Sequence, residues 1–143
     1  MYSFRKSKKG FTLIELMVVV VIIGVLALLG LRLYLTQIAK SNNALVKANA
    51  GTVQTTIQGD LADADPDTVW GWWTGGTMVT RTGIHNPLTK LPQVGSPAVR
   101  NTGDAGEVWV YYDSAATDAR FYINGINAAG DDNVYTTDLV AKY

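Results

Sequence analysis

One acidic side chain, Glu15, stands inside a long apolar run near the amino terminus. Residues 11–31 contain no other charged side chain. A carboxylate is costly to bury in apolar surroundings, so it requires a partner of opposite charge. Cleavage between Gly10 and Phe11 would create an ammonium group on Phe11, one helical turn from Glu15. Glu15 could then pair with this amine in its own chain or in a parallel neighbour. The alternative is that Glu15 lies at a membrane interface, near the lipid headgroups.

The apolar run is long enough to cross a membrane. As a helix, its 21 residues would span about 30 Å, the thickness of a bilayer's hydrocarbon core. Four cations precede the run and only Arg32 closely follows it, which predicts a cytoplasmic amino end and an exported remainder. An ordinary secretory signal has its cleavage site after the apolar stretch, whereas Gly10 precedes it here. We therefore expect cleavage at Gly10 to leave the apolar helix in the mature chain.

The composition excludes several kinds of chemistry. The chain has 143 residues, enough for one domain with an appendage. Its twelve basic and twelve acidic residues cancel, but four cations lie within the first ten residues, so the remainder is mildly acidic and is not expected to bind nucleic acid. The chain has no cysteine, which excludes disulfides and thiol nucleophiles.

The string KKGFTLIELMVVVVIIGVLA, residues 8–27, closely resembles the class III signal sequence and first helix of type IV pilins and of their relatives, the type II secretion pseudopilins. This resemblance implies cleavage after Gly10 by a membrane aspartic prepilin peptidase, which also methylates the new amine of Phe11. It further implies that Glu15 neutralises this amine on an adjacent subunit during filament assembly. Arg32 is a departure, because most family members have a proline at this position, where the helix kinks.

The rest of the chain predicts an α+β fold, in which a long amino-terminal helix packs on a small antiparallel sheet, as the resemblance to pilins also implies. An apolar face through Tyr34, Ile38, Leu45, Ala48, Val53 and Ile57 predicts that the helix continues and ends near Gly59. Short β-like runs follow at residues 77–82, 107–113, 120–124 and 133–137, of which 107–113 and 120–124 form a plausible hairpin. The expected organisation is a cleaved leader (1–10), a transmembrane and filament-core helix (11–31), its amphipathic continuation (32–59) and an exported β-rich region (60–143).

Three further features are candidate sites. Trp70, Trp72 and Trp73 lie in a glycine-flanked stretch that we read as a loop, and they could form a lid over the core, an interface between subunits, or both. Oxygen-rich stretches near the carboxyl terminus and after the helix contain closely spaced carboxylates, and the weak candidates for a metal site are Asp131, Asp132 and Asp138. Because pseudopilins often hold this region with calcium, calcium is an alternative there, but solvated turns are the favoured interpretation and no cofactor is expected.

The sequence offers no credible active site, so we expect no enzyme. His85 is the only histidine, and it lies in a turn-rich loop where a structural or solvated role is usual. The resemblance instead implies a structural subunit, held in the bacterial inner membrane before assembly and in an extracellular filament afterwards. Its partners would be copies of itself, the prepilin peptidase, the pilus assembly platform and minor pilins. The alternatives are a pseudopilin of a type II secretion or DNA-uptake machine and a single-pass membrane-anchored binding domain.

Overall fold

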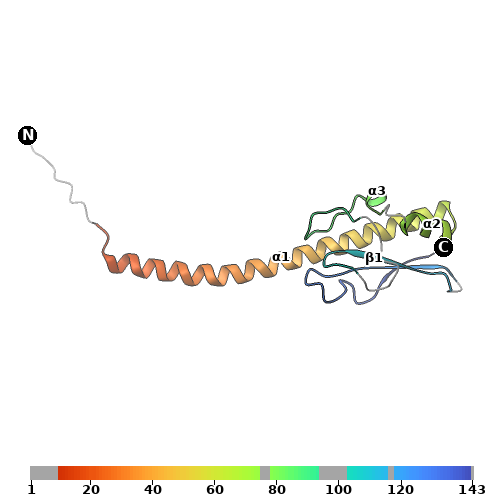
Figure 1. Ribbon diagram of the computed structural model, residues 1–143. Coiled ribbons are helices and arrows are strands. Elements are labelled where there is room, and N and C mark those ends of the chain that lie inside the picture. The colour runs from red at the N-terminus through yellow and green to blue at the C-terminus, as the bar shows by residue number, and fades with distance from the viewer. Residues whose placement is uncertain (1–9, 75–77, 94–102, 116–117, 143) are drawn as a thin grey trace, which may run out of the picture. The chain divides into compact units, whose positions relative to one another are not determined.

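A computed structural model of the chain describes residues 10–74, 78–93, 103–115 and 118–142. The elements are α1 (Leu13–Asp63), α2 (Pro66–Thr74), α3 (Met78–Thr82), β1 (Val108–Asp113), β2 (Arg120–Gly125) and β3 (Leu139–Lys142) (Figure 1). The chain divides into an amino-terminal unit, Met1–Gln37, and a carboxyl-terminal unit, Ile38–Tyr143. α1 begins in the first unit and ends in the second. The expected leader, except for Gly10, lies outside the described residues.

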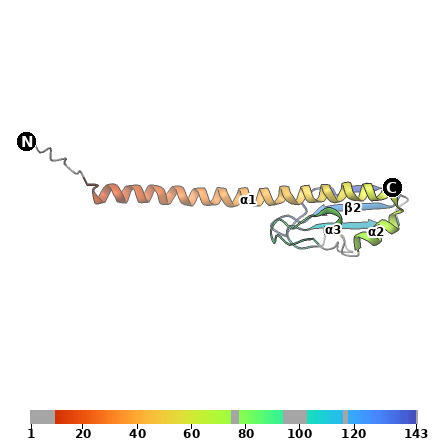
Figure 2. The same ribbon diagram turned by 90° about the horizontal axis from the view of Figure 1, so that it is seen from above.

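The carboxyl-terminal unit is α+β, as the sequence predicts. Its antiparallel sheet has the strand order β1-β2-β3, with Tyr111 opposite Tyr122 and Ile123 opposite Leu139. The predicted hairpin between residues 107–113 and 120–124 is confirmed as β1 and β2. The carboxyl-terminal part of α1 lies along the sheet, as Figure 2 shows.

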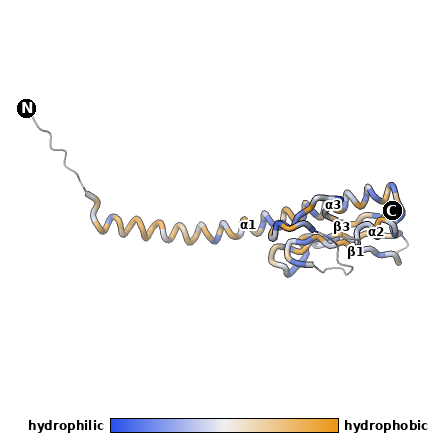
Figure 3. Tube along the Cα trace, turned by 45° about the horizontal axis from the view of Figure 1, so that its top comes forward, coloured by the Kyte–Doolittle hydropathy of each residue, from blue (hydrophilic) through white to orange (hydrophobic). Residues whose placement is uncertain are grey.

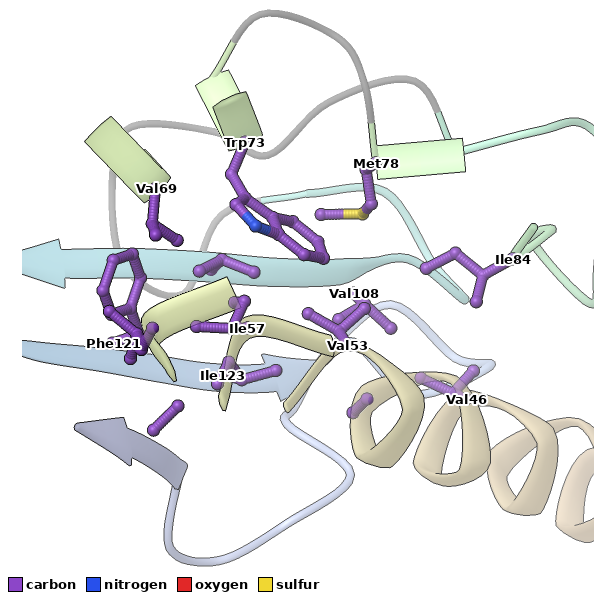
Figure 4. Close-up of a cluster of buried hydrophobic side chains, with 14 residues drawn as sticks. Val46, Val53, Ile57, Val69, Trp73, Met78, Ile84, Val108, Phe121 and Ile123 are labelled. Atoms are coloured by element: carbon purple, nitrogen blue, oxygen red, sulfur yellow. The ribbon is translucent and has the colours of Figure 1, made fainter. Parts of the chain in front are cut away.

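The core of the carboxyl-terminal unit lies between α1 and the sheet. α1 buries a stripe with helical spacing, and side chains of the other elements pack against it (Figure 4). The stripe consists of Val46, Ala50, Val53, Ile57 and Leu61. The face predicted from the sequence is wrong in its earlier members, because Leu45 and Ala48 are exposed. A shift of one residue along a helix rotates the side chain by about 100°, and only the position of the sheet selects the face that is buried.

The tryptophan stretch is a helix, so the prediction of a loop is wrong. Asp65 accepts hydrogen bonds from the backbone N–H and the hydroxyl of Thr68, at 3.0 and 2.6 Å, and so caps the amino end of α2. Pro66 occupies the first helical position, where its missing N–H costs nothing. Val69 and Trp73, four residues apart, then point into the core.

Two predicted strands and the predicted helix end also differ from the structure. Residues 78–82 form α3, which is followed by Gly83 with a positive φ of 67°; Thr77 lies outside the described residues. Residues 133–137 do not form a strand, because the Asn124 side chain bonds both backbone groups of Tyr135, and the third strand follows at β3. α1 extends past Gly59 to Asp63, since burial of Leu61 stabilises one more turn.

Candidate assembly site

The start of α1 holds Glu15 in a capping box, a reciprocal pair of hydrogen bonds at a helix amino terminus. The backbone N–H and the hydroxyl of Thr12 both donate to Glu15 Oε2, at 2.8 and 2.7 Å, and the N–H of Glu15 lies 3.3 Å from Thr12 Oγ1. Sequence reasoning missed Thr12, although Thr-x-x-Glu before an apolar run is the signature of this motif. Thr12 fixes the position of the carboxylate at the helix start, where the helix dipole favours negative charge.

Gly10 and Phe11 are open to solvent. Phe11 is 89% exposed, and a methyl group added at Gly10 would meet no atom within 4 Å. Among the described residues, no packing contact requires glycine at residue 10.

The amino-terminal unit presents an apolar surface all round the helix. Every described residue from Gly10 to Gln37 is exposed, and the colours of Figure 3 show that hydrophobic residues predominate along this part of α1. α1 is long and apolar enough to cross a membrane, and none of its most apolar stretch is buried. A surface of this size needs lipid or other protein to cover it.

The three tryptophans of α2 have different surroundings. Trp73 is fully buried, and its indole N–H donates to Asp60 Oδ2 at 3.1 Å. Trp70 is half-buried and its ring lies 5.7 Å from that of Tyr112. Trp72 is 37% exposed, and the Arg81 guanidinium lies 4.7 Å from its ring centroid. Trp73 is thus part of the core, whereas Trp72 offers the most open ring of the three.

Three carboxylates in the last turn of α1 and just after it have structural partners. Asp60 binds Arg81, which joins α3 to α1. The hydrogen bonds from Thr68 hold the pKa of Asp65 below its usual value. The hydroxyl of Tyr112 donates to Asp67 at 2.8 Å, and burial, together with this bond and the negative charge of Asp67, raises the pKa of Tyr112 to about 12.

The weak metal candidates do not form a common site among the described residues. Asp131 accepts a hydrogen bond from Asn127 at 2.7 Å, Asp132 from the N–H of Asn133 at 2.8 Å, and Asp138 from Asn124 at 2.9 Å. Within the described ranges, no three carboxylate or histidine side chains are grouped to hold a metal ion. His85 Nδ1 lies 2.9 Å from the carbonyl of Gly83, in a local turn contact.

Amide side chains fix the carboxyl-terminal region, and sequence reasoning did not foresee this. β3 lies at one edge of the sheet, and its carbonyls at Val140 and Lys142 accept hydrogen bonds from Gln54 and Gln58 of α1, each at 3.0 Å. Asn124 bonds the N–H and carbonyl of Tyr135, at 3.1 and 3.0 Å. In a chain without cysteine, these bonds and the core hold the terminus and cover an edge strand that would otherwise be open to pairing.

Comparison with known proteins agrees with the amino-terminal features. Residues 5–31 match the family model described as the prokaryotic N-terminal methylation motif. The chain is 40% identical over 81 residues to a type IV major fimbrial protein FimA of Dichelobacter nodosus, covering 55% of this chain and 52% of that protein. It is also 44% identical over 63 residues to the fimbrial protein EcpB of Eikenella corrodens (44% of this chain, 40% of that protein). With the type IV major alpha-pilin of Moraxella bovis it shares 42% identity over 55 residues (38% of this chain, 35% of that protein).

These matches confirm the resemblance to type IV pilins that the first helix predicts. The chain spans about half the length, or less, of the curated relatives that it matches. No solved structure matches it significantly. The three relatives are named as fimbrial proteins or pilins, and none is named as an enzyme.

Proposed function

We propose that this chain is the precursor of a structural subunit of a type IV pilus filament. The observation that carries the proposal is its similarity, over about half its length, to type IV major fimbrial proteins. The exposed apolar helix supports it, because such a surface requires a cover, and a bundle of copies provides one after the chain leaves the membrane. No catalytic role is part of the proposal.

Processing precedes assembly in this proposal. The chain is held in the bacterial inner membrane by residues 11–31, with residues 1–10 on the cytoplasmic side, as the cations of the leader favour. The prepilin peptidase cleaves between Gly10 and Phe11 and methylates the new amine. The open space around Gly10 supports this, because glycine there fills no packing role among the described residues.

Assembly then joins copies through α1. Glu15, held by Thr12, accepts the ammonium group of Phe11 from a neighbouring copy, and the apolar residues of 11–31 exchange lipid contacts for protein contacts. Residues 32–59 and the exported region, 60–143, surround this core, and the tryptophans of α2, foremost the exposed ring of Trp72, contribute contacts between copies. Minor pilins and a membrane assembly platform are the further partners.

The test is mass spectrometry of the amino terminus of protein sheared from the cell surface, with electron microscopy of the same fraction. Fibres whose subunits begin at a methylated Phe11 are the expected result. Glu15→Gln, which keeps the shape of the side chain but removes its charge, should still be cleaved and should yield few fibres, whereas Glu15→Asp should retain more. A chain with an intact leader, found only in the membrane and never in fibres, would contradict the proposal.

A further inference from the structure

The peptide bond that the proposed processing cleaves lies outside α1. The helix begins at Leu13, and Gly10, Phe11 and Thr12 precede it without helical structure. Its first backbone hydrogen bond runs from the N–H of Leu16 to the carbonyl of Thr12, at 3.3 Å. Among the described residues, no N–H donates to the carbonyl of Gly10 or of Phe11. The carbonyl that must react is therefore open.

Hydrolysis of this bond requires access to the carbonyl of Gly10. Water adds to its carbon to form the new carboxyl group, negative charge develops on its oxygen, and the C–N bond breaks as the nitrogen of Phe11 takes up a proton. In an α-helix the same oxygen would accept the N–H of Ile14, four residues on, and the neighbouring turn would shield the carbon. A helix that included Gly10 would therefore be a poor substrate.

Thr12 ends the helix just after the bond to be cleaved. Its hydroxyl oxygen lies 3.3 Å from the N–H of Glu15, and its own N–H donates to Glu15 Oε2 at 2.8 Å, so two N–H groups at the helix start have partners. Without these bonds both groups would be unpaired at the edge of the apolar segment, where an unpaired polar group is costly. A longer helix, whose open end lies nearer to water, would then be favoured.

We propose that Thr12 is a positioning residue for cleavage. As the cap of α1 it holds Gly10 and Phe11 outside the helix, where the peptidase binds them as an extended segment. This inference rests on the proposed function and concerns its processing step alone. The surroundings fit an incoming partner, because the Phe11 side chain is 89% exposed and the space around Gly10 is open. Thr12 thereby has a task before assembly, separate from holding Glu15 in the filament.

Two substitutions separate capping from recognition of the threonine shape. Valine has the shape of threonine but does not cap a helix, whereas asparagine has another shape and is among the strongest caps. The full-length chain in detergent micelles is mixed with the prepilin peptidase, and loss of residues 1–10 is timed by mass spectrometry. Thr12→Val should be cleaved about fivefold more slowly than wild type, because loss of a cap shifts a helix end by about this factor.

Three variants should be cleaved at close to the wild-type rate. Thr12→Ser and Thr12→Asn keep a side-chain oxygen that accepts from the first turn. Thr36→Val is the matched control, since the hydroxyl of Thr36 donates to the carbonyl of Arg32 at 3.1 Å inside the helix, far from the cleaved bond.

The start of the helix is measured separately, in the uncleaved chain without peptidase. Backbone chemical shifts of Gly10 and Phe11 in micelles should have non-helical values in wild type and in Thr12→Asn. They should move toward helical values in Thr12→Val. This readout links a change in cleavage rate to the position of the helix end.

The outcomes distinguish this inference from the proposed function. Rapid cleavage of Thr12→Val, slow cleavage of Thr12→Asn, or unchanged chemical shifts in Thr12→Val would overturn the role of the cap and leave processing itself intact. A wild-type chain that the peptidase does not cleave would overturn the proposed processing, and this inference with it.

Discussion

Replacing Gly125 by alanine tests how closely β2 packs against α1. A methyl group at residue 125 would overlap Cγ1 of Val46 and would lie 3.3 Å from both the Glu107 carbonyl and Val134 Cγ2. Val46 is fully buried and β-branched, so it has little freedom to move away. Forcing an extra methyl group into a packed core costs about 1–3 kcal/mol, and we expect this loss in the free energy of unfolding.

The size of the effect can be checked by removing the atoms that collide. Val46→Ala alone deletes two buried methyl groups, each worth about 0.8 kcal/mol, and leaves a cavity, so it should cost about 2 kcal/mol. In the double variant the new methyl group at residue 125 occupies part of that cavity. The double variant should therefore be more stable than the sum of the two single changes predicts, by about 1–2 kcal/mol.

Urea unfolding of the full-length chain in detergent measures these differences, with the fluorescence of the buried Trp73 and Trp109 as the signal. Gly51→Ala is the matched control, since a methyl group there meets no atom within 4 Å; it should be neutral or stabilise by up to about 1 kcal/mol, as alanine favours helix. Strict additivity of Gly125→Ala and Val46→Ala would refute the close approach of strand and helix.

Two further predictions concern the contacts that attach α2 and α3. Asp60→Ala leaves the buried indole N–H of Trp73 without its acceptor, which should cost about 1–3 kcal/mol in thermal or urea unfolding. The same change should cost less in a Trp73→Phe background, where the donor is absent, and an equal cost in both backgrounds would contradict this reasoning. The folded-state pKa of Tyr112 is raised from 10.0 to about 12, so its protonated phenol contributes stability that is complete below pH 10 and is lost as the pH rises through 12. Wild type should therefore lose more stability than Tyr112→Phe over this pH range, with tyrosinate absorbance reporting the ionisation, and equal losses would argue against the raised pKa of Tyr112.

Local patterns predicted the hairpin and the two-part helix. Strand β1 alternates Val108 and Val110 toward the core with Trp109 on the other face, a period that only an extended chain produces. The apolar run before Arg32 is recognised just as easily, because residues that are apolar on every side of a helix give the same signal whatever the rotation of the helix. In both places the pattern that predicts the structure is formed by residues close together in the sequence.

The failures lie where a distant contact outweighs local preference. Residues 133–137 have the composition of a strand. However, the side-chain amide of Asn124 forms hydrogen bonds with both the N–H and the carbonyl of Tyr135, and the strand that pairs with β2 is β3. The tryptophan stretch contains Gly71 and reads as a loop, yet it forms a helix whose Val69 and Trp73, on one face, are buried in the core. Neither partner can be identified from the segment itself.

The sequence by itself determined the amino-terminal motif, because Gly10, Phe11, Glu15 and the apolar residues on which the proposed cleavage, charge pairing and membrane crossing rest lie in one continuous stretch of the chain. Tertiary structure alone decided which face of α1 is buried and how the carboxyl terminus is held. The bonds from Gln54 and Gln58 to β3 join residues more than 80 positions apart, and their donors look like ordinary surface amides until the sheet lies beside the helix. Hydrogen bonds between such distant groups are selected by the packing of the whole unit, which no local pattern encodes.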